Sequence, residues 1–146
     1  MDALMKSVSR IHRCADAFRA AALPGKNLNS CQHIYIFHIC RLPGISQEQL
    51  ADKICVNKSS VTRQLTSLEK KGFILRRPDQ NDRRILRAYP TKKAEETYPQ
   101  VLDCMVRWNA LLLEDFSEQE RTALLSMLKR IAEKAVVLAD GQRLQP

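Results

Sequence analysis

One stretch in the middle of the chain constrains the fold more than any other, because it specifies two short helices joined by a tight turn. Residues 46–49 read Ser-Gln-Glu-Gln, a capping box in which the serine and the second glutamine satisfy each other's backbone N–H groups. The first helix is therefore predicted to begin at Gln47 and to end near Cys55. Asn57 is a favourable N-cap for the second helix, which reaches Lys71 ahead of a glycine.

A strand-turn-strand pattern follows directly after Gly72. Segments 73–77 and 84–89 are strand-like, and the sequence Pro-Asp-Gln-Asn-Asp-Arg between them is typical of a turn, so a two-stranded wing is predicted. The two preceding helices must also cross rigidly, and the small Ala51 suits their closest approach. The apolar side chains predicted to meet at this crossing are Leu50, Ala51, Ile54, Val56, Val61, Leu65 and Leu68.

Helical spacing of apolar residues, interrupted by glycine and proline, predicts further helices on both sides of this motif. They are the apolar stripe from Leu4 to Ala22, a second helix from about Asn29 to Arg41, a long helix capped by Thr91 and bent or restarted at Pro99, and a last helix that opens at the capping box 117–120. The last helix carries Leu124, Leu128, Ile131, Ala135 and Leu138 on one stripe.

Positive charge is concentrated in residues 53–93, which carry 12 of the 24 Lys and Arg side chains but only three acids. The net charge of this segment is +9, and that of the remainder is −1, against +8 for the whole chain. A basic block that coincides with a groove-sized helix and a hairpin is typical of a DNA-binding surface. The polar face of the helix could also be merely solvated, but the adjoining basic wing favours DNA. Candidates to face the groove are Ser59, Thr62, Arg63, Thr66 and Lys70, and Lys58, Lys70 and Lys71 suit phosphates.

Other classes of protein are disfavoured by the composition. A chain of 146 residues suits one domain, and no apolar run approaches the length of a membrane span or signal sequence, so the cytoplasm is expected. The five cysteines lack the spacing of a disulfide framework or zinc site, and reduced thiols are expected. A metal site at Cys31, His33 and His38 is disfavoured, because imidazoles five residues apart point to different helix faces. No cofactor is predicted, and no nucleophile or phosphate-loop motif supports an enzyme.

The order of elements and the residues themselves resemble the MarR family, the multiple-antibiotic-resistance type of winged-helix transcription regulator. The resemblance is carried by residues 50–74, by Arg76-Arg77-Pro78, by Asp82-Arg83-Arg84 and by Thr91. It implies a mainly α fold with a small two-stranded β-wing, in which a winged helix-turn-helix is joined to a helical dimerisation region built from the N- and C-terminal helices. A single domain would span residues 1–146, with dimerisation helices at 1–23 and 91–140, a DNA-binding lobe at 29–89 and a tail at 141–146.

The resemblance also implies a function, that of a homodimeric repressor on a pseudo-palindromic DNA operator. The helix from Asn57 to Lys71 would enter the major groove, and Arg84, oriented by Asp82, would reach the minor groove. The alternative for this pair is an ion pair that only stabilises the turn. The DNA-contacting residues implied are Asn57, Lys58, Ser59, Ser60, Thr62, Arg63, Thr66, Lys70, Arg83 and Arg84. Pro90 and Ala94 depart from the family pattern and leave the strand end and the following hinge open.

Regulation is also implied by the resemblance, through a small, often aromatic or phenolic anion bound between the dimerisation helices and the winged-helix lobe. The candidate lining residues are His33, Phe37, Arg41 and Trp108, each of which also has a plain core or surface interpretation. Some relatives sense oxidants through a cysteine of the N-terminal helix, and Cys14 lies near that location, where it can equally be a packing cysteine. A winged helix used only for protein contact is a further alternative, against which Arg83, Arg84 and Arg87 argue.

Overall fold

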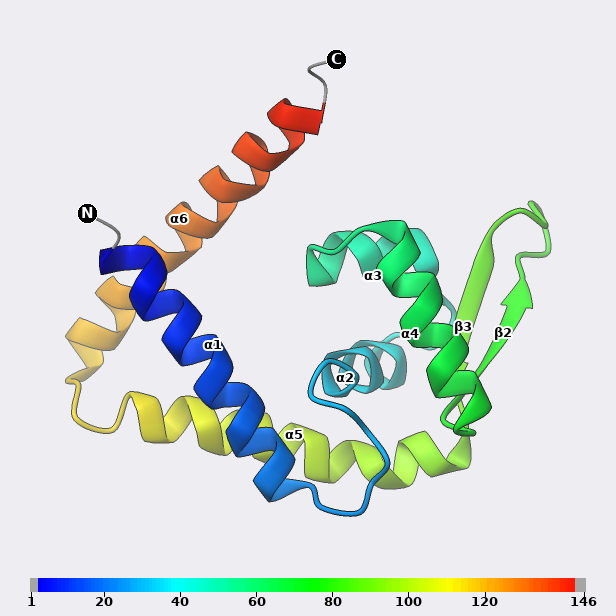
Figure 1. Ribbon diagram of the computed structural model, residues 1–146, viewed down its shortest axis with the longest axis horizontal. Coiled ribbons are helices and arrows are strands. Elements are labelled where there is room, and N and C mark those ends of the chain that lie inside the picture. The colour runs from blue at the N-terminus through cyan, green and yellow to red at the C-terminus, as the bar shows by residue number, and fades with distance from the viewer. Residues whose placement is uncertain (1–2, 144–146) are drawn as a thin grey trace. The chain divides into compact units, whose positions relative to one another are not determined.

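The computed structural model describes the backbone of residues 3–143 and the side chains of residues 3–141. Its elements are α1 (Ala3–Ala22), α2 (His33–Arg41), β1 (Ile45–Ser46), α3 (Gln47–Ile54), α4 (Lys58–Lys70), β2 (Ile74–Pro78), β3 (Leu86–Pro90), α5 (Lys92–Leu112) and α6 (Glu118–Arg143) (Figure 1). They form two compact units, residues 1–108 and residues 109–146. The expected fold class, mainly α with a small β-wing, is confirmed.

The predicted helix-turn-helix is present, and its caps are those expected from the sequence. The Ser46 hydroxyl accepts the Gln49 N–H at 3.1 Å, and the Gln49 side chain accepts the Ser46 N–H at 3.0 Å. Asn57 caps α4 by accepting the Ser60 N–H at 2.8 Å. Between the helices, Cys55 takes a left-handed backbone with φ of 57°, which is uncommon for a residue other than glycine and makes the turn tight.

The core of the first unit forms where α3 and α4 cross above α2. The fully buried side chains there are Ile36, Ile39, Leu50, Val61, Leu65, Leu68 and Phe73. Ile54 and Val56 are half-buried against them, so the apolar set predicted for the crossing is confirmed. Burying each large apolar side chain stabilises the folded state by about 1.5–3 kcal/mol relative to leaving it exposed. This core therefore holds the helix-turn-helix rigid without help from another chain.

The predicted wing is confirmed as the antiparallel pair β2 and β3, but the sheet has a third strand. β1 pairs with β3, so that Ile45 lies opposite Ala88, and the strand order is β1-β3-β2. A strand of two residues is too short to show an alternating pattern, which is why the sequence did not reveal it. β2 begins at Ile74 and β3 at Leu86, each later than predicted, and the loop between them is closed where the Asp79 backbone N–H donates to the carbonyl of Ile85.

The start of α2 was predicted near Asn29 but lies at His33. Residues 29–32 form a turn instead, because the Asn29 side chain accepts the Cys31 N–H at 3.1 Å and the Gln32 side chain accepts the Asn29 N–H at 3.2 Å. Side chains of asparagine commonly compete with helical hydrogen bonds in this way. The turn places the side chain of Gln32 inside the protein.

The helix α5 runs through Pro99 without restarting. The hydroxyl of Thr91, predicted as the cap of α5, shares its one proton between the carbonyls of Gly72 and Phe73 at 2.6 and 3.0 Å, and so ties the start of α5 to the end of α4. One face of α5 is buried, with Ala94 completely enclosed, which explains why a small residue stands there. Farther along, Trp108 packs against Phe18 of α1 with ring centroids 5.1 Å apart.

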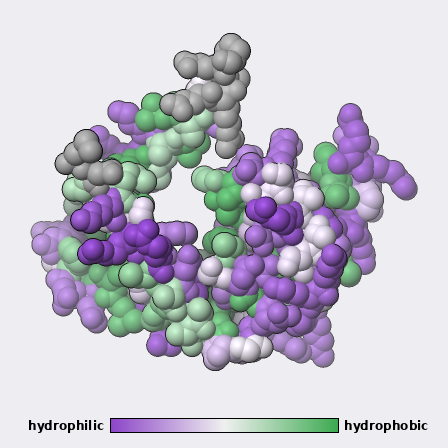
Figure 2. All heavy atoms as spheres, viewed as in Figure 1, coloured by the Kyte–Doolittle hydropathy of each residue, from purple (hydrophilic) through white to green (hydrophobic). Residues whose placement is uncertain are grey.

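The second unit consists of the end of α5 and the long helix α6. The predicted capping box is confirmed, because Ser117 accepts the Glu120 N–H at 3.2 Å and Glu120 accepts the Ser117 N–H at 2.8 Å. The helix continues to Arg143, into the segment expected as a tail, and residues 144–146 lie outside the described part. Its large apolar side chains are exposed (Figure 2), namely Leu125, Met127, Leu128, Ile131, Val136, Val137 and Leu138.

Candidate nucleic-acid interface

The helix α4 presents its polar residues along an exposed face, as predicted. Arg63 and Lys70 are exposed, and neither makes a hydrogen bond or ion pair with any part of the chain that the structure describes. Lys58 is also exposed and lies 3.3 Å from the Glu48 carboxylate of α3. The Ser59 hydroxyl donates to the Asn57 side chain at 2.8 Å and so belongs to the cap. Arg63 and Lys70 are therefore available to an anion, whereas Lys58 is paired with an acid and the cap residues are already engaged.

Two threonines of α4 are more constrained than the sequence suggested. The Thr62 hydroxyl donates to the carbonyl of Lys58 at 3.0 Å, and the Thr66 hydroxyl donates to the carbonyl of Thr62 at 2.8 Å. Each hydroxyl also receives a hydrogen bond, Thr62 from the amide of Gln47 at 3.3 Å and Thr66 from the guanidinium of Arg76 at 3.2 Å. Both hydroxyls are thus already hydrogen-bonded to other groups of the protein.

Arg76 of β2 is the centre of a network that sequence reasoning missed. Its guanidinium donates to the Glu69 carboxylate at 2.8 and 3.3 Å, to Gln47 of α3 at 3.3 Å and to Thr66 of α4. The Arg76 side chain is only 15% exposed. This hydrogen bonding lowers the pKa of Glu69, although burial opposes the effect. The network joins the wing, α4 and α3. Its signal in the sequence is the alternation of side chains along β2, which turns Arg76 inward between two exposed residues.

The loop at the wing tip is built around Asp79. Its carboxylate accepts the backbone N–H groups of Asn81 and Asp82 at 2.8 and 3.0 Å and the guanidinium of Arg87. The Arg87 hydrogen bond is the main reason that the pKa of Asp79 falls to about 2, and the two backbone N–H groups add to it. Arg87 also donates to the carbonyl of Gly44 at 2.8 Å, so this cation braces the sheet and is not available at the tip.

Asp82 and Arg84 lie in the arrangement that the resemblance implied. The Arg84 guanidinium donates to both carboxylate oxygens of Asp82, at 3.0 and 2.9 Å, and the Arg84 backbone N–H donates at 3.1 Å. The Arg84 side chain is nevertheless 91% exposed. These hydrogen bonds lower the pKa of Asp82 and raise that of Arg84, so both groups stay charged. Arg83 beside them is exposed and makes no polar contact with the described residues.

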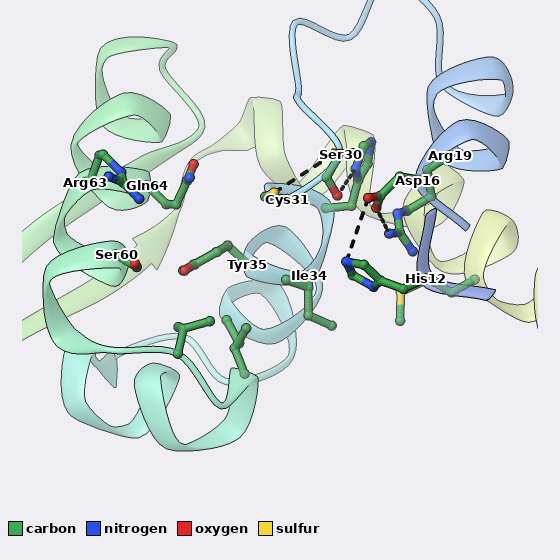
Figure 3. Close-up of a pocket in the computed structure, with 14 residues that line it drawn as sticks. His12, Asp16, Arg19, Ser30, Cys31, Ile34, Tyr35, Ser60, Arg63 and Gln64 are labelled. Atoms are coloured by element: carbon green, nitrogen blue, oxygen red, sulfur yellow. Dashed lines mark hydrogen bonds and ion pairs between the residues drawn. The ribbon is translucent and has the colours of Figure 1, made fainter. Parts of the chain in front are cut away.

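A cavity of about 470 Å³ lies in the first unit, lined by residues of α1, α2 and α4 (Figure 3). His12, Asp16 and Arg19 line one side, and Ser60, Arg63 and Gln64 line the other. Among the four residues predicted to line a ligand site, only His33 lies there. The others make contacts elsewhere, since Arg41 stacks on Phe37, with its guanidinium carbon 5.3 Å from the ring centroid, and Trp108 packs on Phe18.

Two buried nitrogens of this cavity lack a partner. They are Nε2 of His33 and Nε of Arg19, and neither forms a hydrogen bond within the described chain. His33 is 2% exposed, and burial is the main cause that lowers its pKa, so the ring is neutral at pH 7. Arg19 pairs with Asp16 through its terminal nitrogen. Buried polar groups without partners are costly, so these two nitrogens are unsatisfied in the free protein.

The turn that precedes α2 connects this cavity to α4. Gln32, which is fully buried, donates to Gln64 at 3.2 Å and to Ser67 at 3.0 Å, and accepts from Lys71 at 2.8 Å. Gln64 also lines the cavity. No local sequence pattern predicts this contact, because the two segments are more than thirty residues apart. Side-chain hydrogen bonds therefore join this turn directly to α4 and to Lys71 at its end.

The cysteines differ in exposure. Cys14, the candidate redox residue, is exposed on α1, as are Cys31 and Cys55 in their turns. Burial raises the pKa of Cys40 to about 11 and also raises the pKa of Cys104. Among the described residues, no group of three or more His, Cys, Asp or Glu side chains is placed to hold a metal ion. The same residues include no helix long and apolar enough to cross a membrane.

A helix-turn-helix with cations along its second helix, followed by a hairpin with an anchored and exposed guanidinium, defines the winged helix-turn-helix class. The sequence model of the MarR family matches residues 28–86. The crystal structure of MarR is 36% identical, with 97% of this chain and 98% of that chain aligned and a TM-score of 0.78. The chain therefore belongs to the MarR family of transcription regulators, which are not enzymes.

Two further solved structures are similar over most of their length. The transcriptional regulator SlyA is 27% identical, covers 98% of this chain and 99% of its own, and superposes with a TM-score of 0.90. A MarR family transcriptional regulator from Listeria monocytogenes, complexed with a 26-mer DNA, is 29% identical, covers 93% of this chain and 91% of its own, and has a TM-score of 0.86. The fold is thus one that supports DNA binding in a relative.

Proposed function

We propose that the chain is a homodimeric repressor that binds a pseudo-palindromic operator in the cytoplasm, with α4 in the major groove and the wing in the minor groove. The observation that carries this proposal is the exposed guanidinium of Arg84, held at the wing tip by two hydrogen bonds to Asp82, which also accepts the Arg84 backbone N–H. A narrow minor groove concentrates negative potential and favours such a cation. The exposed cations of α4 and the DNA complex of the Listeria relative support it.

Dimerisation is supported by two apolar helix faces. Leu4, Met5, Val8 and Ile11 of α1 are each more than one-third exposed, and α6 exposes most of its apolar side chains. Monomeric proteins rarely leave contiguous apolar faces in water. We assign residues 1–23 and 91–140 to contacts with a second copy, and residues 29–89 to DNA. A two-fold dimer then presents two recognition helices to two symmetric half-sites.

The test is fluorescence anisotropy of the protein against DNA from upstream of its own gene, with a scrambled duplex as the control. Tighter binding to the upstream duplex is expected. The logarithm of the affinity should fall with the logarithm of salt concentration, by about 0.9 for each phosphate neutralised. Equal affinity for both duplexes would instead favour a winged helix that serves protein contact only.

Release of the DNA by a ligand is the second part of the proposal. We place the ligand in the cavity of about 470 Å³, whose lining includes His33 and Arg19. A small aromatic acid or phenol fits this lining, because neutral His33 can accept from a hydroxyl and the Arg19 guanidinium attracts a carboxylate. Such a ligand lies against Arg63 and Gln64 of α4. Coupling then follows if the occupied cavity holds α4 in a position that does not fit DNA.

Benzoate, 2-hydroxybenzoate and phenol are suitable probes for calorimetric titration. Wild-type protein is expected to bind at least one of them, His33→Ala to bind it at least tenfold more weakly, and His38→Ala to bind it like wild type. His38 is the matched control because it lies on the same helix but outside the cavity. Equal loss in both variants, or equal binding in all three proteins, would remove His33 from the site.

A further inference from the structure

Thr62 and Thr66 lie one turn apart on the DNA-facing side of α4, between α3 and the wing. Thr62 is exposed and Thr66 is half-buried. Threonine in a recognition helix can contact a base in two chemically different ways. Its hydroxyl can hydrogen-bond to base edges, or its methyl group can pack against the 5-methyl group of thymine. The hydrogen bonds of this chain distinguish between these two modes.

A threonine hydroxyl has one proton to donate. In Thr62 that proton is directed to the carbonyl of Lys58, and in Thr66 to the carbonyl of Thr62. Neither hydroxyl can therefore donate to an acceptor on a base, such as N7 of a purine or O4 of thymine, without breaking a helix contact. Each also accepts a hydrogen bond from a neighbouring side chain, which leaves at most one lone pair for a base donor.

The neighbours that hold these hydroxyls are themselves anchored. Arg76, which donates to Thr66, also forms charge-assisted hydrogen bonds with Glu69 and donates to Gln47. Gln47 in turn donates to Thr62, so one network fixes both threonines. Networks with a charged centre are stronger than isolated neutral hydrogen bonds. A base that competed for these hydroxyls would have to disrupt the connection between α3, α4 and β2.

We propose that Thr62 and Thr66 read DNA through their methyl groups and that each half-site of the operator presents thymine 5-methyl groups to them. The proposal rests on the proposed function, because it requires α4 to enter the major groove. The Arg76 network acts as a positioning device, since it turns the hydroxyls toward the protein and leaves the methyl groups to meet the bases. Sequence preference at these steps would then arise from apolar contact.

The experiment begins with a duplex selected from a random pool by repeated rounds of binding. Each thymine of that duplex is then replaced singly by uracil, which keeps the base edge but lacks the 5-methyl group. Wild-type protein is expected to bind about fourfold more weakly at the contacted positions, as expected for loss of one buried methyl group. The same duplexes are titrated against Thr62→Ser, Thr62→Val, Thr66→Ser and Thr66→Val.

The serine variants keep the hydroxyl but lose the methyl group, so each should become indifferent to uracil at its own position. The valine variants keep a methyl group and lose the hydroxyl, and they should retain the preference for thymine. Thr122→Ser is the matched control, because Thr122 of α6 makes the same type of bond, from its hydroxyl to the carbonyl of Glu118 at 2.9 Å. It should retain the full uracil effect.

Each result has a distinct meaning. If no duplex is enriched, the proposed function fails and this inference fails with it. If a duplex is enriched but no uracil substitution weakens binding, the regulator stands and the methyl contact is wrong. Retention of the full thymine preference in the serine variants would show that the threonine methyl groups do not make the contact, and the inference would be wrong. If the variants at Thr62 and Thr66 lose affinity for every duplex without a change in thymine preference, both threonines have only a structural role and the inference is wrong.

Discussion

The winged-helix region buries its large apolar side chains, whereas α6 leaves most of its own exposed. In the first, Leu50, Val61 and Leu65 are completely buried, and the polar groups between the helices are hydrogen-bonded to one another. In α6 the large side chains remain exposed, with Val137 at 70% and Leu138 at 61%. The winged-helix region therefore completes its core within one chain, whereas α6 needs a second protein surface to cover its apolar side chains. Substitutions in the two regions should therefore affect different measurements.

The largest effect is expected from Leu128→Asp in α6. A buried leucine contributes about 1.5–3 kcal/mol and a two-fold dimer contains two copies, so dimer stability should fall by about 3–6 kcal/mol. Sedimentation velocity across protein concentration measures the change. Ser126→Asp, which adds the same charge at an exposed polar position of the same helix, should remain dimeric. A dimeric Leu128→Asp protein would show that α6 is not the contact surface.

The next effect concerns the interior of the winged helix. Leu65→Ala removes a fully buried side chain and should lower the free energy of unfolding by about 2–5 kcal/mol, because transfer energy is lost and a cavity remains. Urea denaturation followed by circular dichroism gives the value. At urea concentrations well below the unfolding midpoint, the variant should still sediment as a dimer. A change below 0.5 kcal/mol would mean that this crossing is not the stabilising core.

A smaller effect is expected from a substitution at the wing tip, which should change DNA binding but neither dimer stability nor the free energy of unfolding. Arg84→Ala should weaken operator binding by about 1.5–3 kcal/mol for each wing, the range for hydrogen bonds to charged groups, without altering dimerisation or unfolding. Asp82→Asn should weaken binding less, because the guanidinium remains but loses its bidentate partner. Anisotropy titrations at one salt concentration compare the variants. Wild-type affinity in Arg84→Ala would exclude the wing tip from the site.

The smallest expected effect is the response of stability to mild acid. His33 and His38 both have lowered pKa values in the folded protein, mainly because they are buried. Their contribution to stability is complete above the unfolded value near 6.5 and is lost as the pH falls below it. Urea midpoints from pH 8 to pH 5 should therefore decline. The double variant with glutamine at both positions should decline less, and an identical slope would contradict this origin.

A second acid transition belongs to the wing. The folded pKa of Asp79 is about 2, below its ordinary value of 3.8. A depressed carboxyl pKa stabilises the folded state above 3.8, and this contribution disappears as the pH falls toward 2. Asp79→Asn should remove that part of the acid response, which nuclear magnetic resonance of the wing-loop amides can follow. Retention of the transition in the variant would assign it to another carboxyl group.

The local elements were predictable because their signals are contained in a few neighbouring residues. The structure contains the predicted hydrogen bonds of the capping boxes at 46–49 and 117–120, of the Asn57 cap and of the Asp82–Arg84 pair. The prediction for the start of α2 was wrong, and the third strand of the sheet was not predicted. In the first case side chains formed a turn that competes with the helix, and in the second a strand of two residues carries no periodic signal. The roles of the DNA-contacting residues and of Cys14 remain predictions.

The order of elements, the crossing of α3 and α4 and the position of the basic segment follow from the amino-acid sequence, because caps, apolar spacing and charge act over a few residues. Which polar groups are engaged depends on the tertiary structure. It brought Arg76 to Thr66 and Gln47, Gln32 to Gln64, and His33 to a cavity shared with α1. Such contacts join residues far apart in the chain, and their geometry depends on how whole elements pack, which no local pattern specifies.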